Sequence, residues 1–122
     1  MTKKEIIEET ANFYNLTNRG ITLSGECVYY VTDTHKCCAV GRCLKDPESF
    51  QNKVALYLNT DITSIVNEGL DIKNLFKEEY SGHSVDFWDD LQYFHDKSLN
   101  WSVSGLTKHG LQSKNDLLEK HE

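Results

Sequence analysis

The sequence has a single proline, only two arginines among its thirteen basic residues, and no long apolar run. It also lacks an excess of positive charge, because nineteen Asp and Glu residues give the 122-residue chain a net charge of −6. Proteins that bind DNA or RNA need a basic surface against the phosphate backbone, so nucleic-acid binding is disfavoured. A helix that crosses a bilayer needs about 18 consecutive apolar residues, and no membrane span is predicted here.

The N-terminal stretch MTKKEIIEET lacks the apolar core of a secretory signal. The protein is therefore predicted to stay in the cytoplasm, where thiols remain reduced. The four cysteines, Cys27, Cys37, Cys38 and Cys43, are accordingly expected to be free, buried or metal-bound rather than paired as disulfides. Length and an ordinary composition, with 39% hydrophobic residues, predict a single domain over residues 1–122.

The residue patterns predict an α+β fold. Thr2 and Glu5 form a capping box that starts a helix over residues 3–15. Residues 21–33 are rich in β-branched and aromatic side chains, and a turn at 33–36 leads to the run C-C-A-V-G. This pattern predicts an antiparallel β-hairpin, with the option of a third strand at 20–24.

Five or six helices are predicted to pack around this hairpin. Asp46 and Pro47 start one of them, with Asp as the N-cap and Pro at the first helical position. After the first helix, the segments with a helical pattern lie at 47–58, 61–68, after Asp71, at 85–96, at 101–110 and after Ser113, and not all of them need be separate helices. The run V-A-L-Y-L at 54–58 also fits a strand.

The cysteine-rich segment raises the question of a metal site formed by Cys27, His35, Cys37 or Cys38, and Cys43. Structural zinc sites usually take paired ligands at close spacing, and no C-x2-C pair is present. Buried, small hydrophobic thiols are therefore the favoured interpretation, and no metal or cofactor is predicted. A Cys43 nucleophile beside Arg42 is a further alternative, but the sequence shows no base placed to activate it.

His95 and Asp96 are a second possible metal site, because a His-Asp pair on a helix is typical of one class of metal-dependent phosphohydrolases. Such a site needs further ligands on converging helices, and the pair alone is a weak signal. The competing interpretation is a partly buried helix histidine that hydrogen-bonds a backbone group.

The two arginines are candidates for anion binding. Arg19 and Arg42 each lie next to a glycine, in a chain that otherwise uses lysine as its cation. A guanidinium binds an oxyanion with two parallel hydrogen bonds, which an ammonium does not do. If the ends of the first helix and of the second strand approach each other, the two arginines could meet beside aromatic residues that stack on a base. Ion pairs with nearby carboxylates are the alternative.

Several blocks of the sequence resemble a family of small proteins frequent in phage and prophage genomes. The blocks are N-R-G at 18–20, C-V-Y at 27–29, C-A-V-G-R-x-L at 38–44, L-Q-x-x-H-D at 91–96, Trp101, and H-G-L at 109–111. The resemblance implies a setting rather than an activity. It also directs attention to Gln92, His95 and Asp96, whereas Cys37 and Cys43 lie outside the family's pattern and residues 46–80 depart from it most.

Together these observations predict a phage-type accessory protein that binds and sequesters a small anionic, nucleotide-like ligand, such as a signal of host defence, without catalysis. In that setting its location would be the host cytoplasm, and a homo-oligomer is possible. One alternative is a module that inhibits a host protein by acidic mimicry, using carboxylates such as Glu78, Glu79, Asp86, Asp89 and Asp90. A less favoured alternative is a phosphohydrolase that uses His95 and Asp96. The predicted ligand-binding residues are Arg19, Tyr29, Arg42, Trp88, Gln92, His95 and Asp96.

Overall fold

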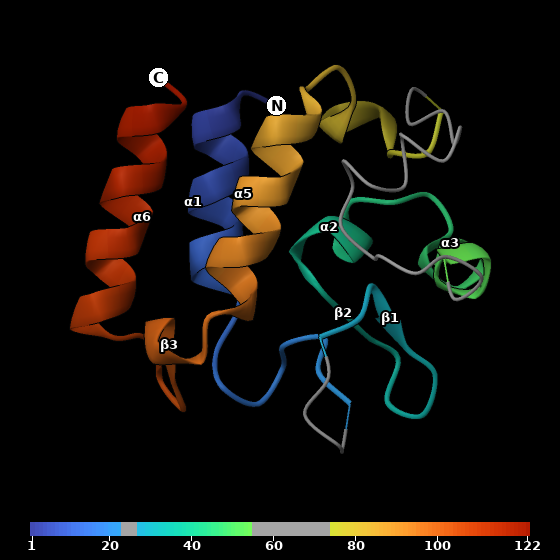
Figure 1. Cartoon of the computed structure of the whole chain (residues 1–122), viewed down its shortest axis with the longest axis horizontal. Helices are drawn as coiled ribbons and strands as arrows, with labels where there is room; N and C mark the ends of the chain where they lie inside the picture. Colours follow the sequence, from blue (N-terminus) through green and yellow to red (C-terminus); the bar gives the residue numbers. More distant parts are fainter. Residues whose placement is uncertain (23–26, 55–73) are drawn as a thin grey trace.

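The computed structural model describes residues 1–22, 27–54 and 74–122, which form a mixed α+β structure (Figure 1). Its elements in chain order are α1 (Lys3–Phe13), β1 (Tyr30–Val31), β2 (Lys36–Cys37), α2 (Ala39–Arg42), α3 (Pro47–Val54), the 3-10 turn η1 (Glu78–Tyr80), α5 (Val85–Asp96), the 3-10 turn η2 (Ser98–Asn100), β3 (Trp101–Ser102), β4 (Gly105–Leu106) and α6 (Lys108–Lys120). None of the helices described is long and apolar enough to cross a membrane.

Three helices make up one side of the molecule. Figure 1 shows α6, α1 and α5 running side by side, with the N-terminus of α1 and the C-terminus of α6 at the same end. The hairpin β1–β2, the short α2 and α3 lie on the other side of α5. The single turn α2 packs on α5 and so joins the two parts.

Side-chain caps define the starts of the long helices. The predicted capping box is confirmed, because the Glu5 amide donates to Thr2 Oγ1 and the Thr2 amide donates to the Glu5 carboxylate. Helix α1 then ends at Phe13, two residues earlier than predicted. Ser84 caps α5 and Thr107 caps α6 in the same manner, each accepting a backbone N–H three residues later.

The predicted hairpin is present but short. β1 and β2 are antiparallel, with Tyr30 opposite Cys37 and Val31 opposite Lys36. The optional third strand is reduced to an isolated bridge between Ile21 and Cys27, and residues 23–26 lie outside the described ranges.

The second strand does not continue through the run C-C-A-V-G as the sequence pattern suggested. Residues Ala39–Arg42 form α2 instead, and Cys38 is its N-cap, with Sγ accepting the Gly41 amide at 3.2 Å. Gly41 also packs directly on the backbone of Tyr29, where a Cβ atom would stand 2.0 Å from the carbonyl oxygen. The Cys38 cap and the close approach of Gly41 to Tyr29 therefore outweigh the preference of Val40 for a strand.

The prediction for the C-terminal part was wrong in one respect. Residues 101–106, expected to be helical, form the hairpin β3–β4, in which Gly105 adopts a φ of +126° that other residues rarely reach. Residues 108–110 of that predicted helix and the helix predicted after Ser113 instead form one helix, α6. Gly110 lies inside α6 rather than at its end. A glycine is needed at this position because a Cβ would meet the Asn100 carbonyl oxygen at 2.2 Å.

In the described ranges, four helices exceed a single turn: α1, α3, α5 and α6. This is fewer than the five or six predicted from the sequence. The helix predicted at 61–68 and the end of the one predicted at 47–58 lie outside the described residues, and residues 74–76 after the expected Asp71 start are not helical.

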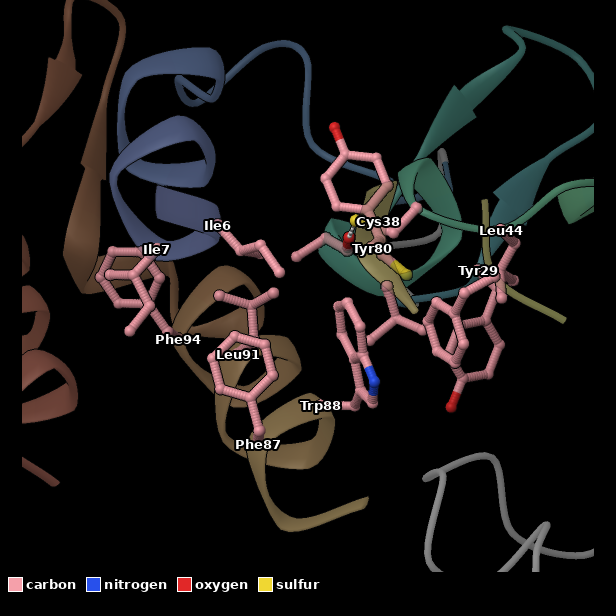
Figure 2. Packing of buried hydrophobic residues seen from close by; sticks show 14 of the residues in the cluster. Ile6, Ile7, Tyr29, Cys38, Leu44, Tyr80, Phe87, Trp88, Leu91 and Phe94 are labelled. Atoms are coloured by element: carbon pink, nitrogen blue, oxygen red, sulfur yellow. Dashed lines mark hydrogen bonds between the residues drawn. The ribbon is translucent and has the colours of Figure 1, made fainter. Parts of the chain in front are cut away.

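The hydrophobic core lies between α1, α5 and the α2 region. Figure 2 shows Phe87, Leu91 and Phe94 of α5 close to Ile6 and Ile7 of α1. Trp88 extends from α5 toward the other group of buried side chains, which includes Tyr29, Cys38 and Leu44 (Figure 2).

Candidate functional site

Arg19 lies at the C-terminal end of α5. Its Nη1 donates to the carbonyl oxygens of His95 and Asp96, both at 3.2 Å, and Trp101 Nε1 donates to the same His95 oxygen at 2.9 Å. The last carbonyls of a helix have no partner within the helix, and cations near them are favoured by the helix dipole. The buried Arg19 side chain is therefore engaged in ending α5.

The preceding carbonyls of α5 are satisfied as well. Asn100, which is completely buried, donates from Nδ2 to the Phe94 oxygen at 2.8 Å, and the Lys97 amide donates to the Tyr93 oxygen. Asn100 also binds His109 through Oδ1, and so connects α5 to α6. Four residues from the blocks of the family resemblance therefore meet at the C-terminal end of α5: Arg19, His95, Asp96 and Trp101.

Both ring nitrogens of His95 are occupied. Nε2 accepts the backbone N–H of Gly20 at 3.2 Å, so in the neutral ring Nδ1 carries the proton and donates to Asp96 Oδ1 at 2.8 Å. Burial lowers the pKa of His95 below its ordinary value, and the edge of the Tyr14 ring packs against the imidazole with centroids 4.7 Å apart. No nitrogen of His95 is left for a metal ion or for proton transfer to a substrate.

The described residues contain no group of three or more His, Cys, Asp or Glu side chains arranged to hold a metal ion. Asp96 instead accepts a second hydrogen bond from Gln92 Nε2 at 2.7 Å, and Gln92 Oε1 accepts the amide of Val40 at 3.2 Å. Gln92, His95 and Asp96 were predicted to bind a ligand. In the structure their polar atoms connect α5 to α2 and to the segment after α1.

Two aromatic residues predicted to stack on a ligand are in the core. Trp88 is completely buried and stacks on Phe76, with ring centroids 4.2 Å apart and planes 12° from parallel. Tyr29 is buried with its ring edge-to-face against Phe50. Neither ring has an exposed face, so these two predicted contacts are corrected.

The cysteines have the surroundings of thiols rather than thiolates. Burial raises the pKa of Cys43 to about 12 and holds the pKa of Cys38 well above its ordinary value. Burial also raises the pKa of Cys27, to about 11, with Asp96 adding to the shift. A nucleophilic cysteine needs a lowered pKa, so the structure gives no support to Cys43 in that role.

Arg42, at the end of α2, lies in a different place from Arg19. Its Nη1 donates to Glu9 Oε1 at 2.6 Å and to the Tyr80 hydroxyl at 3.2 Å, and the Tyr80 hydroxyl donates to the same Glu9 oxygen. The guanidinium carbon lies 5.1 Å from the ring centroid of Phe13 and 5.7 Å from that of Tyr80. We call Glu9, Phe13, Arg42, Lys77 and Tyr80 the Arg42 site.

The two arginines therefore do not form one site. Arg19 is bound to backbone carbonyls at the end of α5, and Arg42 is bound to a carboxylate of α1. Phe13, beneath Arg42, contacts Tyr14, whose ring in turn contacts His95. The expected meeting of the first helix end with the second strand end does occur around Tyr14, but the guanidinium groups point to separate partners.

Two donors of Arg42 have no acceptor in the described part of the chain. Its Nε and Nη2 are buried and have no hydrogen-bond partner among the described residues, and its side chain is 16% exposed. Buried polar groups are normally paired, so an unpaired one calls for an explanation such as a bound water or ion. Arg19 has a similar unpaired atom, Nε, but its Nη1 already binds the helix end.

Electrostatics around Arg42 favour an anion. Partial burial alone would raise the pKa of Glu9, but hydrogen bonds from Tyr80 and Arg42 outweigh it and lower that pKa. Lys77 adds a second positive charge that acts on Glu9 and on Cys43. Sequence reasoning missed Glu9, Phe13, Lys77 and Tyr80. The spacing of Glu9 and Phe13 on one helix face was readable, but their pairing with Arg42 is set by tertiary contacts.

A separate surface pocket of about 630 Å³ lies where α1 begins and α6 ends. Lys3, Lys4, His83 and His121 line it, and none of the predicted site residues does. His83 Nε2 bonds to the Met1 carbonyl and His121 Nε2 to Asp90, so both imidazoles already have partners. The unpaired donors of the two arginines lie elsewhere.

Comparisons of the chain with protein-family models, with curated proteins and with solved structures gave no match. The resemblance to a phage and prophage family therefore stays a prediction.

Proposed function

We propose that this protein is a non-enzymatic binding protein that captures a small anionic, nucleotide-like ligand at the Arg42 site. One observation carries the proposal: the Arg42 guanidinium lies over the rings of Phe13 and Tyr80, while two of its nitrogens lack an acceptor among the described residues. In a phage setting, such capture would remove a host-defence signal from the cytoplasm.

The cost of unpaired donors is the reason to expect a ligand there. A buried polar group without a partner costs about 1–3 kcal/mol, and more when it is charged. A planar guanidinium with free N–H groups matches the oxygens of a phosphate, and Lys77 supplies a second cation beside it. The ring of Phe13, whose residue is 52% exposed, offers an apolar face beside the cation for the base of a nucleotide.

Capture without chemistry is favoured over catalysis. His95, Asp96 and Gln92 are engaged in hydrogen bonds that join elements of the fold. The buried thiols have raised pKa values, which is the opposite of what a nucleophile needs. Binding requires only affinity, and the Arg42 site has the charge and the aromatic surface for it.

The test compares thermal unfolding of the wild-type protein with and without inorganic phosphate and a panel of linear and cyclic nucleotides. At least one nucleotide should raise the midpoint, and the shift should be lost in Arg42→Gln. Lys45→Gln is the matched control, because Lys45 is exposed and its replacement removes the same charge nearby. Absence of any shift in the wild-type protein, or equal shifts in the two variants, would refute capture at Arg42.

A second candidate function, a protein-interaction module, is favoured by a different observation. Val103 and Leu99 are 71% and 64% exposed, and Leu111 and Tyr93 are also exposed. Val103 lies in the β3–β4 turn, Leu99 in η2, Leu111 in α6 and Tyr93 in α5. Exposed apolar side chains are found at interaction sites where they form one patch.

The carboxylates expected to mimic an acidic partner are only partly available. Glu78, Glu79 and Asp86 are exposed, Asp90 is paired with Lys120 and His121, and Asp89 is also engaged. Pull-down from a host lysate with wild-type protein and with Leu99→Asn separates the apolar surface from the acidic one. If the Leu99→Asn variant no longer captures the host protein, the apolar surface is the binding site. If capture is lost only at raised salt, the acidic residues are the binding site.

A further inference from the structure

We infer that Glu9 stands in for the anionic group of the ligand, and that it makes the Arg42 site selective for phosphate monoesters over carboxylates. The inference rests on the proposed function and goes further, because it assigns a ligand class and a selectivity-determining residue. Two observations support it: Arg42 and Tyr80 both donate to one oxygen of Glu9, and the Glu9 side chain is more exposed than the Arg42 side chain.

Two donors converge on a single oxygen of Glu9. Arg42 Nη1 lies 2.6 Å from Oε1, and the Tyr80 hydroxyl donates to the same atom. Arg42 Nη1 also donates to the Tyr80 oxygen, so the three groups form a closed set. The Glu9 oxygen therefore occupies a position where two hydrogen-bond donors favour a negatively charged group.

Glu9 can leave this position and Arg42 cannot. The Glu9 side chain is 36% exposed, so rotation about its own bonds returns the carboxylate to water without burying an unpaired charge. The Arg42 side chain is 16% exposed, and its guanidinium lies over the rings of Phe13 and Tyr80. Departure of Glu9 would free Nη1, and Nη2, which has no acceptor among the described residues, shares the same edge of the planar guanidinium.

The donor set suits a phosphate better than a carboxylate. With Glu9 displaced, Nη1, Nη2 and the Tyr80 hydroxyl are available, and Lys77 adds charge. A terminal phosphate carries up to two negative charges and three acceptor oxygens, whereas a carboxylate offers one charge and two oxygens. A carboxylate ligand would only exchange one singly charged carboxylate for another at Arg42, so its binding would gain little free energy.

The experiment uses phenyl phosphate and benzoate as matched aromatic probes, titrated by calorimetry at low salt. Glu9→Gln keeps the shape and an acceptor oxygen but removes the competing charge. Glu8→Gln is the control, because Glu8 is next along α1 and pairs with Lys114 instead. A like charge about 4–5 Å away near a surface changes affinity strongly, so Glu9→Gln should bind phenyl phosphate about tenfold more tightly than the wild type. Glu8→Gln should stay within about twofold, as expected for an exposed charge that is screened.

Glu9→Asp gives a second measurement if Glu9→Gln unfolds, because the shorter side chain keeps the charge but withdraws it from both donors. It too should bind phenyl phosphate more tightly than the wild type.

Equal gains in the Glu9 and Glu8 variants, or benzoate binding as tightly as phenyl phosphate, would overturn the inference. If the wild-type protein captures a nucleotide through Arg42 but the Glu9 variants do not gain affinity, the inference fails and the proposed function stands. If the Glu9 variants bind phenyl phosphate while the wild type captures nothing, the proposed function fails and the assignment of Glu9 stands. No binding of either probe by any form overturns both.

Discussion

The backbone N–H of Gly20 donates to Nε2 of His95, 75 residues further along the chain, at 3.2 Å. Gly20 can lie there because it has no side chain, since a Cβ would come within 2.3 Å of the Cys38 amide nitrogen. The imidazole in turn bonds to Asp96. This contact connects the segment after α1 to α5, and it accounts for a histidine and a glycine that could be taken for parts of an active site.

The state of His95 should make stability depend on pH. Burial puts its pKa in the folded protein below the value near 6.5 of an unfolded chain. Between these two values the unfolded chain takes up a proton that the folded protein does not, so stability is full above about pH 6.5 and is lost as the pH falls. Urea unfolding at a series of pH values should show a slope of up to about 1.4 kcal/mol per pH unit from this group.

The control for this prediction is His95→Gln, whose amide oxygen can still accept the Gly20 N–H but does not titrate. Carboxylates contribute to both proteins, so the difference between their profiles isolates the histidine. Parallel profiles between pH 5 and 7 would contradict the structural role given to His95.

Glycines 20, 41 and 110 should not tolerate alanine. A Cβ would stand 2.3, 2.0 and 2.2 Å from backbone atoms of Cys38, Tyr29 and Asn100, respectively. Backbone atoms cannot move aside as a flexible side chain can, so each substitution should destabilise by about 2–4 kcal/mol, as severe overpacking does. Denaturant unfolding measures the loss. Asn52→Ala, at an exposed position of α3, should change stability by less than about 0.5 kcal/mol.

Arg19→Gln should affect stability but not anion capture. Loss of the guanidinium leaves the Asp96 carbonyl without a described partner and removes one of two donors to His95. Hydrogen bonds from a charged donor contribute about 1.5–3 kcal/mol each, so the free energy of unfolding should fall by about 2 kcal/mol or more. Nucleotide binding by the folded variant should match the wild type. A selective loss of binding with stability unchanged would place the ligand at Arg19 instead.

Tyr80→Phe tests the aromatic hydroxyl at the Arg42 site. The ring near the guanidinium is kept, while the hydroxyl that donates to Glu9 Oε1 beside Arg42 is removed. A hydrogen bond to a charged group contributes about 1.5–3 kcal/mol, so the affinity for phenyl phosphate should fall about tenfold or more. Calorimetry gives the value, with the exposed Tyr93→Phe as control. An unchanged affinity would show that Tyr80 does not contact the anion.

Local signals in the sequence predicted the elements whose causes are local. The capping box at Thr2, the β1–β2 turn and the apolar face of α5 each depend on side chains within one or two turns of chain. The turn was predicted at residues 33–36 and lies at 32–35. The β3–β4 hairpin was missed because its two-residue strands are too short for an alternating pattern to show. Gly110 was misread as a helix end because its reason lies in the carbonyl of Asn100.

The candidate site was predictable only in part. Scarcity of arginine drew attention to Arg19 and Arg42, and both have roles that an ammonium could not perform in the same geometry. Their partners are far away in sequence: Glu9 lies 33 residues before Arg42, and the His95 carbonyl lies 76 residues after Arg19. No pattern along the chain indicates such pairs.

The sequence by itself determined the acidic balance, the α+β class and the starts of α1 and α3, because charge, composition and helix caps are properties of short stretches of chain. The tertiary structure alone decided that His95 is a buried acceptor, that Trp88 is core, and that Arg19 binds the carbonyls at the end of α5 while Arg42 pairs with Glu9. Burial and the supply of partners determine what a polar group can do, and both arise only when distant segments pack together.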